Sequence, residues 1–234
     1  GERLAQLARE GGIDASLHVD EAVSTTVKLR VIGRQQQLLR IDFENRPSHE
    51  VLRAKLDEFA RRLPGCDAVA FSDYGKGGLT HIGEMIRLAR DAGKTVLVDP
   101  KGDDYSAYAG ATLITPNRSE MREVVGRWKD EADLERRAAE LRGQLDLEAL
   151  LVTRSEEGMS LFLADRTIHE KAVAREVFDV SGAGDTVIAT LAVMLAHGAG
   201  WAPAIHVANV AAGIVVGKLG TAVVTRDELA AALN

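Results

Sequence analysis

The chain has 234 residues, 46% of them hydrophobic, a net charge of −6 and a single cysteine, Cys66. The acidic balance argues against a nucleic-acid surface, because neutralising phosphates takes clustered Lys and Arg side chains. One cysteine excludes an intrachain disulfide and a metal site built from several cysteines, which fits a reducing cytoplasm.

The first residues already have helical spacing, with Leu4, Leu7 and Ala8 on one face. A chain that opens inside a helix indicates that an N-terminal piece is absent. The start lacks the basic-then-apolar layout of a signal peptide, and no apolar run has the ~20 residues that span a bilayer. We therefore expect a soluble, cytoplasmic protein.

The next elements predict a small β lid. Two β-favouring runs, residues 25–31 and 37–43, are joined by a polar stretch and form a hairpin. Residues 48–62 have a helical period, with Ser48 as N-cap. The only candidate boundary lies near residue 45, so within one domain, residues 1–234, we expect residues 24–44 to be the lid and 45–234 the nucleotide-binding and catalytic core.

From residue 68 onward, short apolar runs alternate with helical patterns. The expected strands are 68–71, 95–98, 111–115 and 149–153, and the expected helices are 79–92, 118–125 and 131–142. A hairpin at 159–163 and 166–170 and two helices rich in Ala and Val, 183–197 and 203–218, complete the pattern. This alternation predicts an α/β fold in three layers, with a mostly parallel sheet between helices.

A small-residue turn opens the first of these Ala- and Val-rich helices, after a β-favouring run at 177–180. The turn reads Ser181-Gly182-Ala183-Gly184-Asp185. Exposed backbone N–H groups at a helix N-terminus favour phosphate, and small residues let it approach. A carboxylate in the first turn could take the proton of an attacking hydroxyl. An ordinary helix cap explains the spacing equally well.

A second cluster places Asn117 and Glu120 at i and i+3 where a strand leads into a helix. An amide and a carboxylate so spaced suit a hydrated Mg²⁺. Taken alone, a capping box between the same two residues is the favoured interpretation.

Two loops at predicted strand ends carry charge, with Asp73 and Lys76 in one and Asp99 and Lys101 in the other. Ligands of open α/β sheets bind beyond the carboxyl ends of the strands, so these lysines are placed to meet an anionic substrate. Exposed loop lysines are more often only solvated.

Together, Asn117-x-x-Glu120 and Gly182-Ala183-Gly184-Asp185 resemble the ribokinase-like family of sugar and nucleoside kinases. The resemblance implies ATP and Mg²⁺ as cofactors and transfer of the γ-phosphate to a sugar hydroxyl. It also implies that Asp185 is the base, that Gly182, Ala183 and Gly184 form the anion hole, and that Asn117 and Glu120 hold Mg²⁺ through water.

Further segments resemble the family's nucleotide side and assign Thr153, Gly158 and Asn209 to ATP, although Asn209 is equally suited to helix packing. Residues 26–31, 34–43, 73–77 and 215–221 resemble the branch that phosphorylates heptose phosphates, which implies a route to lipopolysaccharide. The resemblance implies these contacts to the sugar phosphate: Asp73, Lys76, Lys101, Arg30 and Gln36. Lys28 and Arg40 are further candidates in the lid. A homodimer through the lid, residues 24–44, is also implied.

The chain departs from the family pattern at its start, where the Gly-Gly-x-x-Asn type segment that grips the sugar is not present. It also lacks the His-x-Gly-His motif of a nucleotidyltransferase, so we expect kinase activity only. Two alternatives stay open: a kinase for ribose, fructose or fructose 1-phosphate, and a nucleotide-binding protein without turnover.

Overall fold

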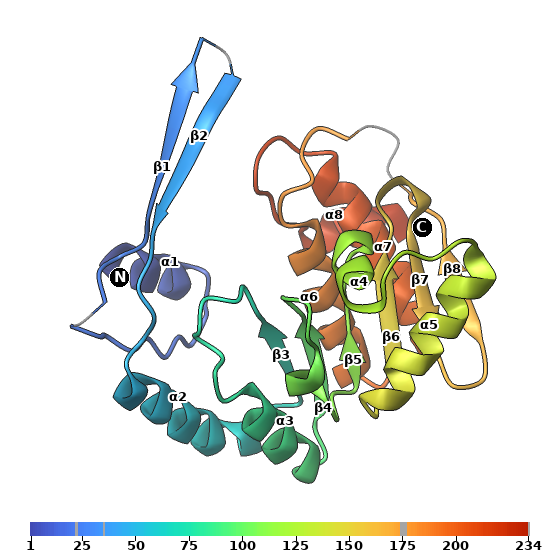
Figure 1. Ribbon diagram of the computed structural model, residues 1–234, viewed down its shortest axis with the longest axis horizontal. Helices are drawn as coiled ribbons and strands as arrows, with labels where there is room; N and C mark the ends of the chain where they lie inside the picture. The colour runs from blue at the N-terminus through green and yellow to red at the C-terminus, as the bar shows by residue number, and fades with distance from the viewer. Residues whose placement is uncertain (22, 35, 174–176, 234) are drawn as a thin grey trace. The chain divides into compact units, whose positions relative to one another are not determined.

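The computed structural model describes residues 1–21, 23–34, 36–173 and 177–233. Figure 1 shows the chain coloured from its N-terminus to its C-terminus. The chain forms two compact units: Gly1–Arg62 with Lys76–His81, and Leu63–Gly75 with Ile82–Asn234. The boundary near residue 45 stays a prediction.

The first unit contains a two-stranded ribbon and two helices. Its elements are α1 (Glu2–Glu10), β1 (Val27–Gly33), β2 (Gln36–Phe43) and α2 (His49–Arg62). The two strands pair antiparallel, which confirms the predicted hairpin; Gln35, in its connection, lies outside the described residues. The hydroxyl of Ser48 accepts a hydrogen bond from the Val51 amide at 3.4 Å, as expected of an N-cap.

The second unit contains a six-stranded sheet in the order β3-β4-β5-β6-β7-β8. The strands are β3 (Ala68–Ser72), β4 (Thr95–Asp99), β5 (Leu113–Ile114), β6 (Ala149–Thr153), β7 (Met159–Phe162) and β8 (Thr167–Glu170). Strands β3 to β6 are parallel, and β7 and β8 continue the sheet antiparallel. The predicted mostly parallel sheet with an edge hairpin is confirmed.

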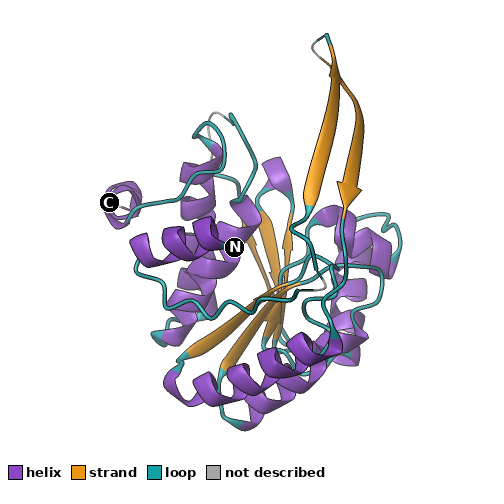
Figure 2. Ribbon diagram, turned by 90° about the vertical axis from the view of Figure 1, so that its left-hand side faces the viewer, coloured by secondary structure: helices purple, strands orange, loops and turns teal. Residues whose placement is uncertain are grey.

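Helices cover both faces of this sheet, and Figure 2 shows the strands lying between them. The helices are α3 (Ile82–Asp91), α4 (Arg118–Val125), α5 (Glu131–Gln144), α6 (Ala183–Ala196), α7 (Trp201–Val216) and α8 (Arg226–Leu233). Helix α3 packs on β4, α4 on β6, and α5 on β6 and β7. Within the described part of the chain, no helix is long and apolar enough to cross a membrane.

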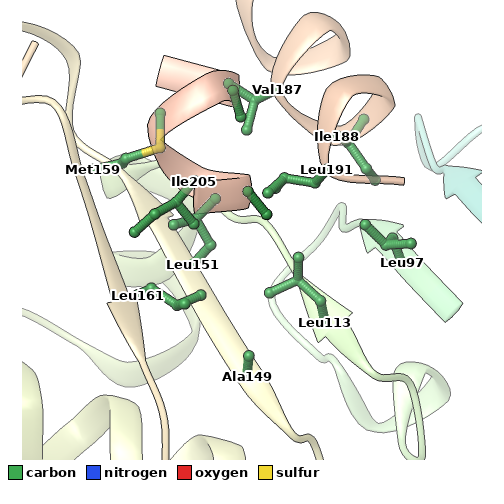
Figure 3. Close-up of a cluster of buried hydrophobic side chains, with 12 residues drawn as sticks. Leu97, Leu113, Ala149, Leu151, Met159, Leu161, Val187, Ile188, Leu191 and Ile205 are labelled. Carbon is green, nitrogen blue, oxygen red and sulfur yellow. The ribbon is translucent and has the colours of Figure 1, made fainter. Parts of the chain in front are cut away.

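The main core lies between the sheet and helices α6 and α7. Leu97, Leu113 and Leu151 from three strands are buried in one cluster with Leu191 and Ile205 from the helices (Figure 3). Burying one such side chain contributes about 1.5–3 kcal/mol. This core holds the N-terminus of α6 against the sheet.

One predicted element is wrong. Residues 177–180 form no strand: the amides of Phe178 and Asp179 both donate to the carbonyl of Val216, at 2.8 and 3.3 Å. Val177, Phe178 and Val180 are exposed. β-Branched and aromatic residues favour a strand only where a neighbouring strand supplies the ladder, and here the partner is the end of helix α7.

Candidate active site

The turn into α6 begins at Gly182, which has the left-handed φ of +80° and is the N-cap of the helix. A Cβ at this position would lie 3.6 Å from Thr221, an ordinary contact, so the requirement for glycine is conformational. The preceding Asp179 accepts a hydrogen bond from the Ser181 amide at 2.9 Å, which lowers the pKa of that carboxyl. The turn is therefore shaped by its own local hydrogen bonds.

Asp185 belongs to the first turn of α6, and its side chain is exposed. The hydroxyl of Tyr74, from the loop after β3, donates to Asp185 Oδ1 at 3.3 Å. The first turn of an α-helix also leaves backbone N–H groups without intrahelical acceptors. A carboxylate and unsatisfied amides therefore stand together at one helix end, although the Ala183 amide donates to the carbonyl of Val180.

A cavity of about 390 Å³ lies beside this turn. Thr153, Gly158 and Asn209, the three residues predicted to bind nucleotide, all line it, together with Ala183 and Gly184 from the turn. Its remaining walls are largely aliphatic side chains, such as valines. A mostly apolar pocket with a few polar groups is typical of a small-ligand site.

Gly158 makes the cavity wall possible. It ends the turn between β6 and β7 with φ +89°, and a Cβ there would lie only 2.0 Å from the carbonyl oxygen of Glu170. Asn209 is buried in α7, and its amide donates to the Lys171 carbonyl at 2.6 Å. Asn209 thus packs a helix against a loop and also faces the cavity.

Asn117 and Glu120 form the capping box that the sequence favoured when they were taken alone. Asn117 Oδ1 accepts from the amides of Ser119 and Glu120, and Glu120 Oε2 accepts from the Asn117 amide. The second carboxylate oxygen, Oε1, accepts from Lys101 Nζ at 2.8 Å. The two residues predicted to hold a metal and one predicted to hold substrate are thus in direct contact.

A group of carboxylates surrounds the end of β4. Burial, followed by the negative charges of Glu120 and Asp185, raises the pKa of Asp99 to about 6 from 3.8. Asp73 contributes to the same field. Burial is the largest cause of the shift, and the nearby carboxylates add negative charge that Lys101 partly offsets; a cation or a cation-bound phosphate would be favoured beside these carboxylates.

Tyr108 connects two of the predicted loops. Its hydroxyl lies 2.9 Å from Asp73 Oδ2 and accepts a hydrogen bond from the Lys101 amide at 3.1 Å. Burial raises the pKa of Tyr108 to about 12, so it stays protonated. Sequence reasoning assigned no role to Tyr74, Asp99 or Tyr108; it noted Asp99 only as a charged residue in the same strand-end loop as Lys101.

The carboxylate of Glu120 and the side-chain amide of Asn117 fit a hydrated Mg²⁺ better than a metal ion held by protein ligands alone. No group of three or more His, Cys, Asp or Glu side chains in the described residues could hold a metal by itself. Mg²⁺ keeps several waters and commonly takes one or two carboxylates plus substrate phosphates. Glu120, within the negative field that also shifts the pKa of Asp99, offers such a partial site.

The remaining predicted substrate residues belong to the first unit. Arg30 and Gln36 lie on the ribbon strands β1 and β2, where Arg30 stands opposite Arg40 and Lys28 opposite Asp42. Lys76 Nζ pairs with Glu44, at 2.6 Å from Oε1.

The architecture is that of known sugar and sugar-phosphate kinases. Phosphofructokinase-2 from Escherichia coli, in complex with potassium, superposes with a TM-score of 0.80 at 17% identity over 98% of this chain and 76% of its own. Ribokinase from Thermotoga maritima gives 0.79 at 20% identity over 99% and 76%. These likenesses confirm the predicted ribokinase-like fold.

Sequence comparison gives the family. Residues 1–227 match the pfkB family of carbohydrate kinases. The D-beta-D-heptose 7-phosphate kinase of Bordetella bronchiseptica is 56% identical over 230 residues, 98% of this chain and 74% of that protein. The bifunctional protein HldE of Hahella chejuensis is 50% identical over 234 residues, and the chain spans only 49% of its length. The chain belongs to the pfkB carbohydrate kinase family.

Proposed function

We propose that this chain transfers the γ-phosphate of MgATP to the C1 hydroxyl of D-glycero-β-D-manno-heptose 7-phosphate. The product is the 1,7-bisphosphate, on the route to ADP-heptose and lipopolysaccharide core. Support for the substrate comes from the 56% identity to a relative named as a heptose 7-phosphate kinase. The use of ATP follows from membership of the carbohydrate kinase family.

One observation carries the proposal. Ala183 and Gly184 line the cavity, and Asp185 follows them in the same helical turn. A nucleotide base in the cavity would direct its phosphates to the N-terminus of α6, where the helix dipole and backbone amides favour negative charge. The carboxylate of Asp185 would then stand next to the terminal phosphate.

In the proposed reaction, Asp185 accepts the proton of the C1 hydroxyl. The hydroxyl oxygen forms a bond to the γ-phosphorus while the bond to the β–γ bridging oxygen breaks, and ADP leaves. Backbone amides of Gly182, Ala183 and Gly184 stabilise the charge on the transferred oxygens. For Ala183 this requires its amide to exchange the Val180 carbonyl for phosphate.

Thr153, Gly158 and Asn209 hold ATP in this proposal, since all three line the cavity. Asn117 and Glu120 hold Mg²⁺ through water, Glu120 by its carboxylate. When bound, the metal neutralises charge on the phosphates. Glu120 can serve because each carboxylate oxygen accepts more than one hydrogen bond.

For the sugar phosphate, we propose Asp73, Lys76, Arg30 and Gln36 as contacts, with Lys28 and Arg40 as further lid residues. Lys76 would exchange Glu44 for the 7-phosphate. Lys101 is proposed for the same phosphate, and its Nζ would exchange Glu120 Oε1, at 2.8 Å, for that phosphate.

We also propose a homodimer through the lid, residues 24–44, in a cytoplasmic enzyme. The ribbon exposes Leu38, Leu39 and Phe43, with 66%, 52% and 58% of their surface accessible. A lone two-stranded ribbon is marginally stable in water, and its edges invite pairing. Sedimentation of the protein and of a Leu38→Glu variant would test this proposal, since the variant should be monomeric.

The function is tested by ADP release with MgATP and a panel of acceptors: heptose 7-phosphate, ribose, fructose and fructose 1-phosphate. The proposal expects turnover confined to the heptose phosphate. Preference for another sugar would overturn the substrate. Binding of ATP with no turnover on any acceptor would overturn the activity and favour a nucleotide-binding protein.

A further inference from the structure

Four charged side chains of the second unit are linked in series by ion pairs. One of the segments that they connect, the turn between β6 and β7, lines the cavity. The four side chains come from the start of α4, the turn between β6 and β7, and the start of α5. In order of contact they are Arg118, Glu157, Arg154 and Glu131. None of the four is used in the proposed reaction.

Arg154 is the most buried member of this series of ion pairs and is only 8% exposed. Its guanidinium makes a bidentate pair with Glu131, at 2.6 and 2.7 Å, and donates to Ser160 Oγ at 3.0 Å. It also donates to Glu157. A buried arginine is costly unless partners surround it, so this many contacts fix the side chain in one geometry.

Glu157 connects this anchored arginine to a second element. Its Oε2 accepts from Arg154 and also pairs with Arg118, the first residue of α4. Arg118 directly follows Asn117 of the capping box. One carboxylate thus ties the turn after β6 to the helix that presents Asn117 and Glu120.

The turn that Glu157 belongs to needs such support. Ser155 has φ +52° and Gly158 φ +89°, so two left-handed residues occur within four positions. A non-glycine residue in this region costs of order 1–3 kcal/mol and persists when its surroundings hold it. Ser155, Glu156 and Gly158 of this turn line the cavity.

We propose that Glu157, held between Arg154 and Arg118, is a positioning residue for nucleotide binding. It fixes the cavity wall formed by the β6–β7 turn relative to the Asn117–Glu120 box. The distance between the wall that binds the base and the groups proposed to bind metal and phosphate is then fixed. ATP therefore binds to a preorganised site. The inference rests on the proposed function in one respect, that the cavity takes ATP.

The test is Glu157→Gln, which keeps the shape of the side chain and removes its charge. The equilibrium Kd for MgATP is measured by calorimetry without sugar, beside the KM for each substrate and the Tm. We expect MgATP to bind about three- to tenfold more weakly with the KM for the sugar phosphate unchanged. An unchanged Kd, or a lowered Tm with both KM values unchanged, would show a structural role only and overturn the proposal.

The matched control is Glu140→Gln, because Glu140 also pairs with an arginine, Arg136 at 2.7 Å, but on the exposed face of α5. It should bind MgATP as the parent does. An equal loss in this variant would mean that surface charge alone sets the affinity, against the proposal.

Arg118→Gln gives a second route if Glu157→Gln fails to fold, since it leaves the Arg154–Glu131 pair intact. It should weaken MgATP binding by a similar factor, and the double variant should be no weaker than Glu157→Gln. The proposal would be overturned if the two substitutions raised the Kd for MgATP by factors that multiply in the double variant, or if Arg118→Gln bound MgATP as the parent does. Because these titrations contain no sugar, failure to phosphorylate heptose 7-phosphate would contradict the proposed reaction alone.

Discussion

Replacing Gly158 by alanine should damage stability and nucleotide binding together. A Cβ at this position would lie 2.0 Å from the Glu170 oxygen, 2.6 Å from the Ala172 nitrogen and 2.7 Å from the Lys171 carbonyl carbon. Real Cβ contacts stay beyond 3.0 Å, so the Glu170 backbone must retreat by at least about 1 Å. That backbone pairs with Met159 at the end of the β7–β8 ladder, and Ala172 lines the cavity.

The expected cost has two parts. A positive φ in alanine costs about 1–3 kcal/mol, and forced displacement of packed backbone adds about 1–3 kcal/mol. For a chain of 150–250 residues, each kcal/mol lowers Tm by about 2–4 °C, so we expect Gly158→Ala to melt roughly 5–20 °C lower. MgATP should bind at least several-fold more weakly, because the displaced segment is cavity wall.

The Tm is measured by differential scanning calorimetry and the Kd for MgATP by titration, with Gly143→Ala as control. A Cβ at Gly143 meets nothing within 4 Å, and this residue lies in helix α5. Alanine there should stabilise the protein by about 0.5–1 kcal/mol. A Gly158→Ala protein with the parent's Tm and affinity would refute the described turn.

Two further predictions concern the carboxylates and the cap. Asp99 has a pKa raised to about 6 from 3.8, so its contribution to stability is present below pH 4 and is lost as the pH rises through 6. Asp99→Asn should therefore melt higher than the parent at pH 8 and show a flatter Tm profile between pH 4 and 6; a steeper profile would contradict the described burial. Asn117→Ala should lose about 0.5–2 kcal/mol of stability with its cap, whereas Asn117→Ser should keep it. We expect Asn117→Ser to keep the parent's Tm but to need a higher Mg²⁺ concentration for half-maximal turnover, because the amide orients metal and phosphate. An unchanged Mg²⁺ concentration for half-maximal turnover would limit Asn117 to capping the helix.

Much of the fold was predictable because its signals are local. The apolar run at 149–153 sits in a sheet covered on both faces, and such strands read as continuous hydrophobic segments. Helix α8 went unpredicted although Thr225 and Glu228 have the spacing of a capping box and make its hydrogen bonds. The run at 177–180 misled because composition does not reveal whether a strand neighbour exists.

The site was predictable only in part. Asn117 and Asp185 stand in motifs whose spacing is visible in the sequence. The contact of Tyr74 with Asp185 joins residues 111 positions apart, and only the folded chain brings them together. The same holds for Lys101 and Glu120, which stand in separate sequence motifs and whose side chains pair at 2.8 Å in the folded chain.

The central claim, that Asp185 is the base of a sugar kinase, is tested most directly by Asp185→Asn, with Asp165→Asn on an exposed turn as control. The rate of ADP formation with MgATP and heptose 7-phosphate is measured beside the Kd for MgATP. Asp185→Asn should bind MgATP nearly as the parent does and turn over several orders of magnitude more slowly, with the control unaffected. Turnover within tenfold of the parent would contradict the assignment of the base.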